Sequence, residues 1–217
     1  VYSGELQCRN LAMKVEAFDE KGQPLINQQG ELVCSAPSPS MPIYFWDDRD
    51  GKKYHAAYFD VFPNVWRHGD FIEINERGGV VIYGRSDATL NPGGVRIGTA
   101  EIYRLVEGME EIEDSLVIGQ NWKGDVRVIL FVKMAEGHEL ADDLRKRIKT
   151  TLRTNASPRH VPAKIITTPA VPYTLNMKKV ELAVKNVIQG RPVLNKDALS
   201  NPEALDYYEN LKELQED

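Results

Sequence analysis

The stretch that decides the fold is residues 84–101, GRSDATLNPGGVRIGTAE, which gathers many special-purpose residues in few positions. It opens with a charged Gly-Arg-Ser-Asp corner and continues through a tight turn at Gly93 and Gly94. Strand-like sequence leads into it, and a helix with Thr99 as the expected N-cap leads out. One apolar helix face is formed by Ile102, Leu105, Val106 and Met109. We therefore expect a seam between two structural units at residues 85–87.

Before this seam the sequence predicts short strands joined by turns. Residues 75–79, NERGG, are a strong hairpin signal, and Gly69 before Asp70 indicates a bulge that turns a carboxylate outward. Residues 45–63 are aromatic-rich and loop-like, with a helical turn expected at residues 54–59. Further strands are predicted at residues 4–8, 13–19 and 31–35.

After the seam, helical and strand patterns alternate, which predicts an α+β domain with a helical tail. The strand at residues 125–133 is apolar on both faces at its centre, so we expect both faces to be covered. The other predicted elements are strands at 114–119 and 163–168, helices at 138–153 and 180–188, and a tail helix that starts at Asn201 and Pro202.

Composition limits the functional classes. The formal net charge of −5 argues against a general nucleic-acid surface, and no apolar run is long enough to cross a membrane. We expect Cys8 and Cys34 to lie in strands as small core residues, in the reducing cytoplasm. Residues 1–5 lack a basic start and an apolar stretch, so we expect no signal peptide there, and the start at Val1 in strand-like sequence leads us to expect part of a longer protein.

Three groups of residues could carry chemistry, and each has a simpler interpretation. The Asp70 carboxylate can accept hydrogen bonds from adjacent sugar hydroxyls with Arg85 as a donor beside it, although spacing alone favours a salt bridge between them. Gly93 and Gly94 permit close approach of a ligand, or simply form a surface turn. Lys178 could reach a phosphate, or be a solvated lysine at a helix start.

The order of these groups is informative. Gly-Asp at 69–70, Gly-Arg-Ser-Asp at 84–87, GGVRIGTAEI at 93–102 and PYTLNMKK at 172–179 together resemble the adenylate-forming superfamily of acyl-CoA synthetases, nonribosomal peptide adenylation domains and luciferases. Residues 96–102 look most like the short-chain acyl-CoA synthetases. WRHGD at 66–70, SPRHVP at 157–162 and NPEAL at 201–205 look most like the members that act on acetoacetate.

The resemblance implies an acid–thiol ligase that works in two half-reactions. Acetoacetate and ATP would give an acyl-adenylate and pyrophosphate, and CoA would then displace AMP, with Mg²⁺ accompanying ATP. Residues 1–86 would be the β-rich end of a large AMP-binding domain, and residues 87–217 a mobile α+β lid with an extra helical tail. The rest of the large domain would lie upstream in the same protein, so this chain alone is predicted to be inactive.

The family's functional positions carry over by motif match. Asp70 and Arg85 would hold the ribose hydroxyls, and Lys178 would bridge the acyl carboxylate and the phosphate. Asp87 matches the hinge about which the lid turns. The remaining ligand contacts would come from Arg96 to phosphates, Gly93 and Gly94 beside the pantetheine path, and Arg153 to a CoA phosphate.

Two positions depart from the family pattern. Met177 stands where the family usually has Gly, which puts the loop's backbone in question and leaves Lys179 as a rival to Lys178. His68 stands where many relatives have Thr. Two alternatives remain open: a synthetase for another short acid such as acetate or propionate, or a non-catalytic nucleotide- or CoA-binding module.

Overall fold

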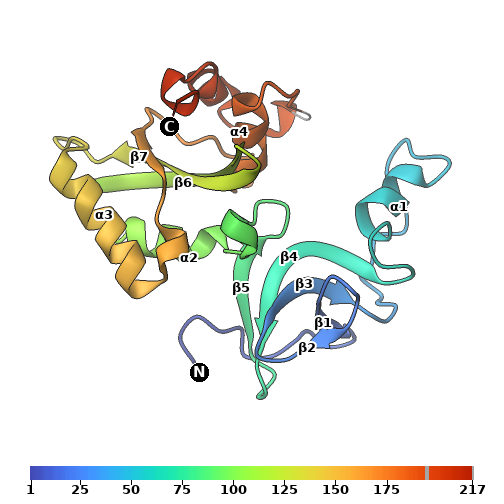
Figure 1. Ribbon diagram of the computed structural model, residues 1–217. Coiled ribbons are helices and arrows are strands. Elements are labelled where there is room, and N and C mark those ends of the chain that lie inside the picture. Colours follow the sequence, from blue (N-terminus) through green and yellow to red (C-terminus); the bar gives the residue numbers. More distant parts are fainter. Residues whose placement is uncertain (194–195, 217) are drawn as a thin grey trace. The chain divides into compact units, whose positions relative to one another are not determined.

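The computed structural model describes residues 1–193 and 196–216, which divide into two compact units, Val1–Asp87 and Ala88–Asp217 (Figure 1). Each unit has its own sheet and its own hydrophobic core. The assignment of residues 1–86 and 87–217 to a nucleotide-binding domain and a lid stays a prediction.

The first unit is built on an antiparallel five-stranded sheet in the order β2-β1-β3-β4-β5. The strands are β1 (Val15–Phe18), β2 (Pro24–Leu25), β3 (Gln29–Cys34), β4 (Trp66–Ile74) and β5 (Val80–Arg85), and a short helix, α1 (Lys52–Tyr58), lies in the connection between β3 and β4. The predicted hairpin at residues 75–79 is confirmed. Asn75 Oδ1 accepts hydrogen bonds from the amides of Arg77 and Gly79 and so fixes the turn between β4 and β5.

One face of this sheet carries the larger core of the unit, because alternate side chains of each strand point to the same side. It contains Val15, Ala17, Cys34, Trp66, Ile72, Ile74 and Val80. Cys34 is buried as predicted, but Cys8 is exposed and outside any strand. The predicted strand at residues 4–8 is wrong, since that segment makes only an isolated bridge from Leu6 to Val80.

The predicted bulge at Gly69 is confirmed. Opposite β3, Glu31 pairs with Phe71 while Val33 pairs with Arg67, so β4 contains extra residues at this point. Gly69 has φ 86°, a conformation that a residue with a side chain rarely adopts. The bulge sets Asp70 opposite Arg85 of β5.

The second unit has a three-stranded sheet in the order β6-β7-β8. Strands β6 (Ile112–Trp122) and β7 (Asp125–Met134) are antiparallel, and β8 (Lys164–Thr167) runs parallel to β7. The helices are α2 (Thr99–Val106), α3 (Asp142–Asn155) and α4 (Glu181–Ile188). Short 3-10 turns complete the unit: η1 (Pro92–Gly94), η2 (Pro158–His160), η3 (Lys196–Ala198), η4 (Pro202–Tyr208) and η5 (Lys212–Leu214).

Both faces of this sheet are covered, as predicted for the strand at residues 125–133 (Figure 1). Alternate residues of β7 enter different cores, with Leu130 facing α2 and α3 and Phe131 facing α4 and the tail. The α2 and α3 side contains Ile102, Val106, Leu144, Ile148 and Leu152, and the other side contains Val184, Leu205, Tyr208 and Leu214. This double layer makes the unit an α+β domain, as the sequence predicts.

Three local predictions in this unit are corrected. Thr99 is the first residue of α2 rather than its N-cap, because Gly98 precedes the helix and donates its amide to Glu101 Oε2 at 3.2 Å. Helix α3 begins at Asp142, later than predicted. The tail forms η4 and η5 instead of one α-helix, with Asn210 at φ 55° between them.

Candidate functional site

In the first unit, Asp70, Arg85 and Asp87 form one charged group beside the β4–β5 edge. Arg85 lies bidentate against Asp87, with Nε–Oδ1 and Nη2–Oδ2 distances of 3.4 Å each. Its closest ion-pair distance to Asp70 is longer, 3.8 Å from Nη1 to Oδ1. The cross-strand salt bridge that spacing favoured is therefore present but loose, and Asp87 is the closer partner of Arg85.

Gly69 is required by this arrangement. A Cβ atom at Gly69 would lie 2.7 Å from Arg85 Nη2, so the guanidinium rests against the bare backbone of the bulge. Desolvation lowers the pKa of Arg85, but Asp87 and Asp70 raise it, and the net shift is upward. The guanidinium is thus held charged and in place.

Asp70 keeps capacity to accept further hydrogen bonds. His68 Nδ1 lies 2.6 Å from Asp70 Oδ2, while Oδ1 has the distant Arg85 contact. The Asp70 side chain is 23% exposed, so polar groups of a ligand can reach it. A partly exposed carboxylate with a guanidinium beside it can bind vicinal hydroxyls. His68, the departure noted in the sequence, acts here as the neighbour of Asp70.

In the second unit, Lys178 closes a tight turn. Thr174 and Lys178 are joined in both directions, from Thr174 N to Lys178 O at 2.8 Å and from Lys178 N to Thr174 Oγ1 at 3.1 Å. The amide of Leu175 also donates to Ala198 O at 3.0 Å, which ties the loop to the tail. Lys178 itself is exposed, and its ammonium contacts no partner in the described part of the chain.

The backbone at Met177 shows which conformation the loop adopts without the glycine that the family usually has there. It adopts φ 58°, the left-handed conformation that a glycine would favour, and its side chain is exposed. The loop therefore has the backbone that glycine allows, at a strain of about 1–2 kcal/mol for an L-residue.

Lys179 is the alternative to Lys178 that the sequence left open. Its side chain forms ion pairs and hydrogen bonds inside the unit. Its ammonium donates to Asp114 Oδ1 at 2.7 Å, to Ser115 O at 2.6 Å and to Glu107. It also lies 4.2 Å from the ring centroid of Tyr103, and its side chain is only 16% exposed. Three acceptors occupy all three donors of this ammonium, so the geometry favours Lys178 as the lysine available to a ligand.

A wider polar network surrounds Lys179 and was missed from the sequence. Tyr173, which bridges Lys179 across the turn, donates its hydroxyl to Asp114 at 2.7 Å. The Tyr103 hydroxyl donates to Glu181 at 2.8 Å, and desolvation raises the pKa of Glu181. These contacts tie the base of the Lys178 turn to α2, β6 and α4. The residues of this network are far apart in the sequence, and no regular spacing predicts that they meet.

The Gly93–Gly94 turn is also held by side chains. Gly93, at φ 58°, donates its amide to both carboxylate oxygens of Asp125 at 3.0 and 3.2 Å. Hydrogen bonds from the amides of Val126 and Gly93 lower the pKa of Asp125. Gly94 has φ 78° and open space where a Cβ would lie, and Arg96 follows in an exposed position. Gly94 is therefore the glycine of this turn that faces outward.

The structure thus places the predicted residues in separate groups. Asp70, Arg85 and Asp87 lie together in the first unit, while Lys178, the Gly93–Arg96 segment and Arg153 belong to three different segments of the second. Arg153 is exposed in the last turn of α3. Among the described residues, no group of three or more acidic, His or Cys side chains is arranged to hold a metal ion.

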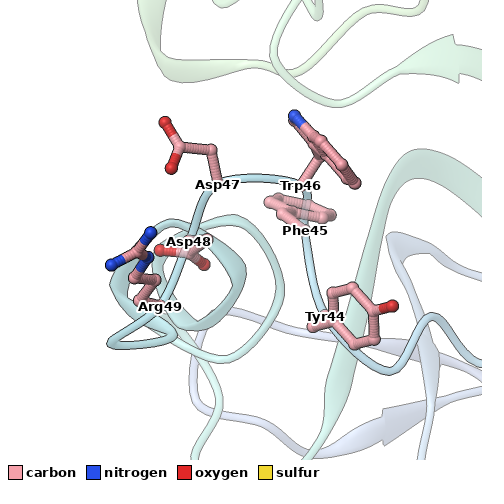
Figure 2. A pocket seen from close by; sticks show the side chains of 6 residues that line it. All are labelled: Tyr44, Phe45, Trp46, Asp47, Asp48 and Arg49. Atoms are coloured by element: carbon pink, nitrogen blue, oxygen red, sulfur yellow. The ribbon is translucent and has the colours of Figure 1, made fainter.

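A cavity of about 480 Å³ lies elsewhere, against residues 44–49 (Figure 2). Figure 2 shows Phe45 and Trp46 on one side and Arg49 on the other, all from one loop of the first unit. None of the predicted site residues lines it. It therefore adds nothing to the candidate site.

Comparison with known proteins finds relatives that match nearly the whole of this chain. The chain is 58% identical over 214 residues to the acetoacetyl-coenzyme A synthetase of Rhizobium meliloti (strain 1021), covering 99% of this chain and 33% of that protein. It is 54% identical over 217 residues to the acetoacetyl-CoA synthetase of Gallus gallus, covering 99% and 32%. No protein-family model matches the chain.

Solved structures give the same result. Acetoacetyl-CoA synthetase from Streptomyces lividans superimposes with a TM-score of 0.92 at 46% identity, covering 100% of this chain and 33% of that one. A benzoate CoA ligase from Burkholderia xenovorans LB400 shares the fold, with a TM-score of 0.70 at 21% identity over 85% of this chain and 36% of that one. No helix among the described residues is both long and apolar enough to cross a membrane.

The fold and the ordered motifs point to one class of protein, because the neighbours of this chain among solved structures are adenylate-forming enzymes. Within that class it matches acetoacetyl-CoA synthetases along its whole length, and it spans about one third of theirs. The sequence-based resemblance and the α+β fold are both confirmed.

Proposed function

We propose that this chain is the C-terminal part of an ATP-dependent ligase that forms acetoacetyl-CoA from acetoacetate, ATP and CoA. The observation that carries the proposal is the 58% identity to an acetoacetyl-CoA synthetase over 99% of the chain. The exposed Lys178 and the Asp70–Arg85 pair supply side chains suited to such a reaction.

The chemistry proceeds in two displacements. A carboxylate oxygen of acetoacetate attacks the α-phosphorus of ATP, forming the acyl-adenylate as pyrophosphate leaves. The sulfur of CoA, having given up its proton, then attacks the acyl carbonyl, forming the thioester as AMP leaves. Both steps develop charge on oxygen atoms, so positioned cations and hydrogen-bond donors lower their barriers.

For the first displacement, Asp70 and Arg85 hold the ribose hydroxyls. The partly exposed Asp70 carboxylate and the Arg85 guanidinium fixed over Gly69 support this role. Lys178 bridges the acyl carboxylate and the phosphate, a role suited to a compact, exposed ammonium that has no partner among the described residues. Lys179 cannot substitute, because its donors are committed to Glu107, Asp114 and Ser115.

For the second displacement, the outward-facing Gly94 lies beside the pantetheine path and Gly93 shapes the turn. Arg96 and Arg153, both exposed, contact phosphates of the nucleotide and of CoA respectively. Asp87 is the hinge about which a mobile lid turns between the steps. Its position as the last residue of the first unit, bidentate with Arg85, supports that role.

Other components complete the reaction. Mg²⁺ arrives with the ATP phosphates, and we assign it no ligand in the described part of the chain. The acyl pocket belongs to an upstream domain of the same protein, consistent with the one-third coverage of the relatives. We also propose a cytoplasmic setting, which the two unpaired cysteines support.

A thioester-forming assay on the full-length protein tests the proposal. Acetoacetate, acetate and butyrate are compared at equal concentration by release of AMP and by loss of free CoA thiol. The proposal requires acetoacetate to give the highest kcat/KM. Preference for acetate would support another short-chain synthetase, and no thioester with any acid would support a binding module.

A further inference from the structure

The segment SPRHVP at residues 157–162 has no task in the proposed reaction, yet it forms a well-defined turn. Ser157 caps the 3-10 turn η2, accepting the amide of Arg159 at 3.3 Å, and its hydroxyl lies 2.9 Å from His160 Nδ1. The turn sends its two last side chains in different directions. Arg159 is exposed, whereas His160 is buried.

Arg159 forms hydrogen bonds with the Gly93–Gly94 turn. Its Nη1 donates to Pro92 O at 2.9 Å and to Gly93 O at 3.4 Å. A Cβ atom on Gly93 would lie only 2.2 Å from this nitrogen, so Gly93 is the residue that lets the guanidinium approach. The two glycines therefore have different tasks, with Gly93 receiving Arg159 and Gly94 left open.

Asp125 binds the same turn as a hydrogen-bond acceptor, whereas Arg159 binds it as a donor. Its carboxylate accepts the Gly93 amide, while Arg159 donates to the carbonyls of Pro92 and Gly93. The amide of this turn is thus bound by the carboxylate of Asp125, and its carbonyls are bound by the guanidinium of Arg159. The two side chains come from different segments of the chain. A surface turn containing two glycines would otherwise sample many conformations.

His160 lies at the far end of the same segment. Its Nε2 lies 3.5 Å from Glu101 Oε2, and that carboxylate accepts the amide of Gly98 at the start of α2. The η2 turn therefore contacts both ends of residues 92–101, the segment that contains Gly94 and Arg96. Of these two contacts, the hydrogen bonds of Arg159 to Pro92 and Gly93 are the closer ones.

We propose that Arg159 is a positioning residue for the thioester-forming step, with Asp125 as its counterpart on the Gly93–Gly94 turn. This inference rests on the proposed function, in which that turn serves CoA and Lys178 serves adenylation. Arg159 and Asp125 are both exposed and contact the turn rather than the buried core. Their loss should therefore alter one half-reaction and leave the fold intact.

The test measures the two half-reactions separately on the full-length protein. ATP–pyrophosphate exchange with acetoacetate reports adenylation, and single-turnover transfer from the bound adenylate to CoA reports thioester formation. For Arg159→Ala we expect exchange within about twofold of wild type and transfer slowed by about tenfold or more, the scale on which loss of positioning acts. Arg159→Lys should recover part of the transfer rate, because it restores a donor but not the fork.

Two further variants sharpen the result. Arg147→Ala is the matched control: it removes an exposed arginine whose partner is Glu111, outside the turn, and should leave both rates at the wild-type level. The double variant Arg159→Ala/Asp125→Ala should lose less than the product of the single losses, because both residues hold one turn.

The inference is overturned if Arg159→Ala transfers to CoA at the wild-type rate, or if exchange and transfer fall equally. Failure of the proposed function looks different, since wild-type protein would then give no exchange and no thioester. Circular dichroism of Arg159→Ala should match wild type, and an altered spectrum would also contradict the positioning role.

Discussion

The neighbouring lysines 178 and 179 allow a sharp prediction, because they have the same chemistry and opposite surroundings. Lys178→Met removes an exposed ammonium with no partner in the described residues. Lys179→Met removes an ammonium with three acceptors and leaves Glu107 and Asp114 without their cation. We predict that only the second substitution lowers the free energy of unfolding.

The magnitude follows from the environment of Lys179. Breaking a buried ion pair by removing one partner costs about 3–5 kcal/mol. The carboxylates left behind are 34% and 19% exposed at Glu107 and Asp114, so water would reach them in part. We therefore expect Lys179→Met to lose about 2–4 kcal/mol, and Lys178→Met to stay within about 0.5 kcal/mol of wild type.

Urea titration of the purified chain, followed by circular dichroism, measures both variants against wild type. The midpoint should fall for Lys179→Met with an unchanged slope, since the same surface is exposed on unfolding. Lys179→Arg is the control for charge, and it should fall between Lys179→Met and wild type because the charge is kept while the compact geometry is lost. Equal midpoints for the two methionine variants would refute the assignment of Lys179 to the interior network.

Three further predictions concern the same unit and the chain as a whole. Burial raises the pKa of Glu181 in the folded chain. The stability that the protonated Glu181 side chain contributes is therefore fully present below about pH 4.3, where a free glutamate titrates. That stability is lost as pH rises through the folded pKa. Glu181→Gln should therefore gain unfolding free energy relative to wild type as pH rises from 4.5 to 7 in paired urea titrations, and a constant difference would contradict the buried environment. Met177→Gly should raise the unfolding free energy by about 0.5 kcal/mol, and Met177→Val should lower it by about 1 kcal/mol, because φ 58° strains a branched side chain most. Thermal unfolding measures both variants, and the reverse order of stability would disprove the strain. The 217-residue chain alone should show no ATP–pyrophosphate exchange above a buffer blank, and measurable exchange would place a complete adenylation site within it.

Much of the fold follows from local patterns in the sequence. The Asn75–Gly79 turn, the bulge at Gly69 and the doubly covered strand β7 each depend on residues within one short segment, and each is confirmed. Errors arose where such patterns lacked a partner. The segment at residues 4–8 has a strand-like composition, but only Leu6 finds a bridge.

Site geometry was predictable only in part. The ordered motifs predict which residues contact ligands, but they could not show that Asp87 is a closer partner of Arg85 than Asp70 is. Nor could they separate Lys178 from Lys179, because that distinction depends on Asp114 and other residues distant in sequence. Ion pairs between segments depend on tertiary packing, and no local periodicity encodes them.

The central claim is that Lys178 carries the adenylation step, and one measurement tests it most directly. ATP–pyrophosphate exchange dependent on acetoacetate is measured for the full-length protein and its Lys178→Ala variant. We predict that the variant loses at least about 100-fold in exchange rate, as expected for removal of a group that stabilises developing charge. An exchange rate equal to that of wild type would contradict the claim.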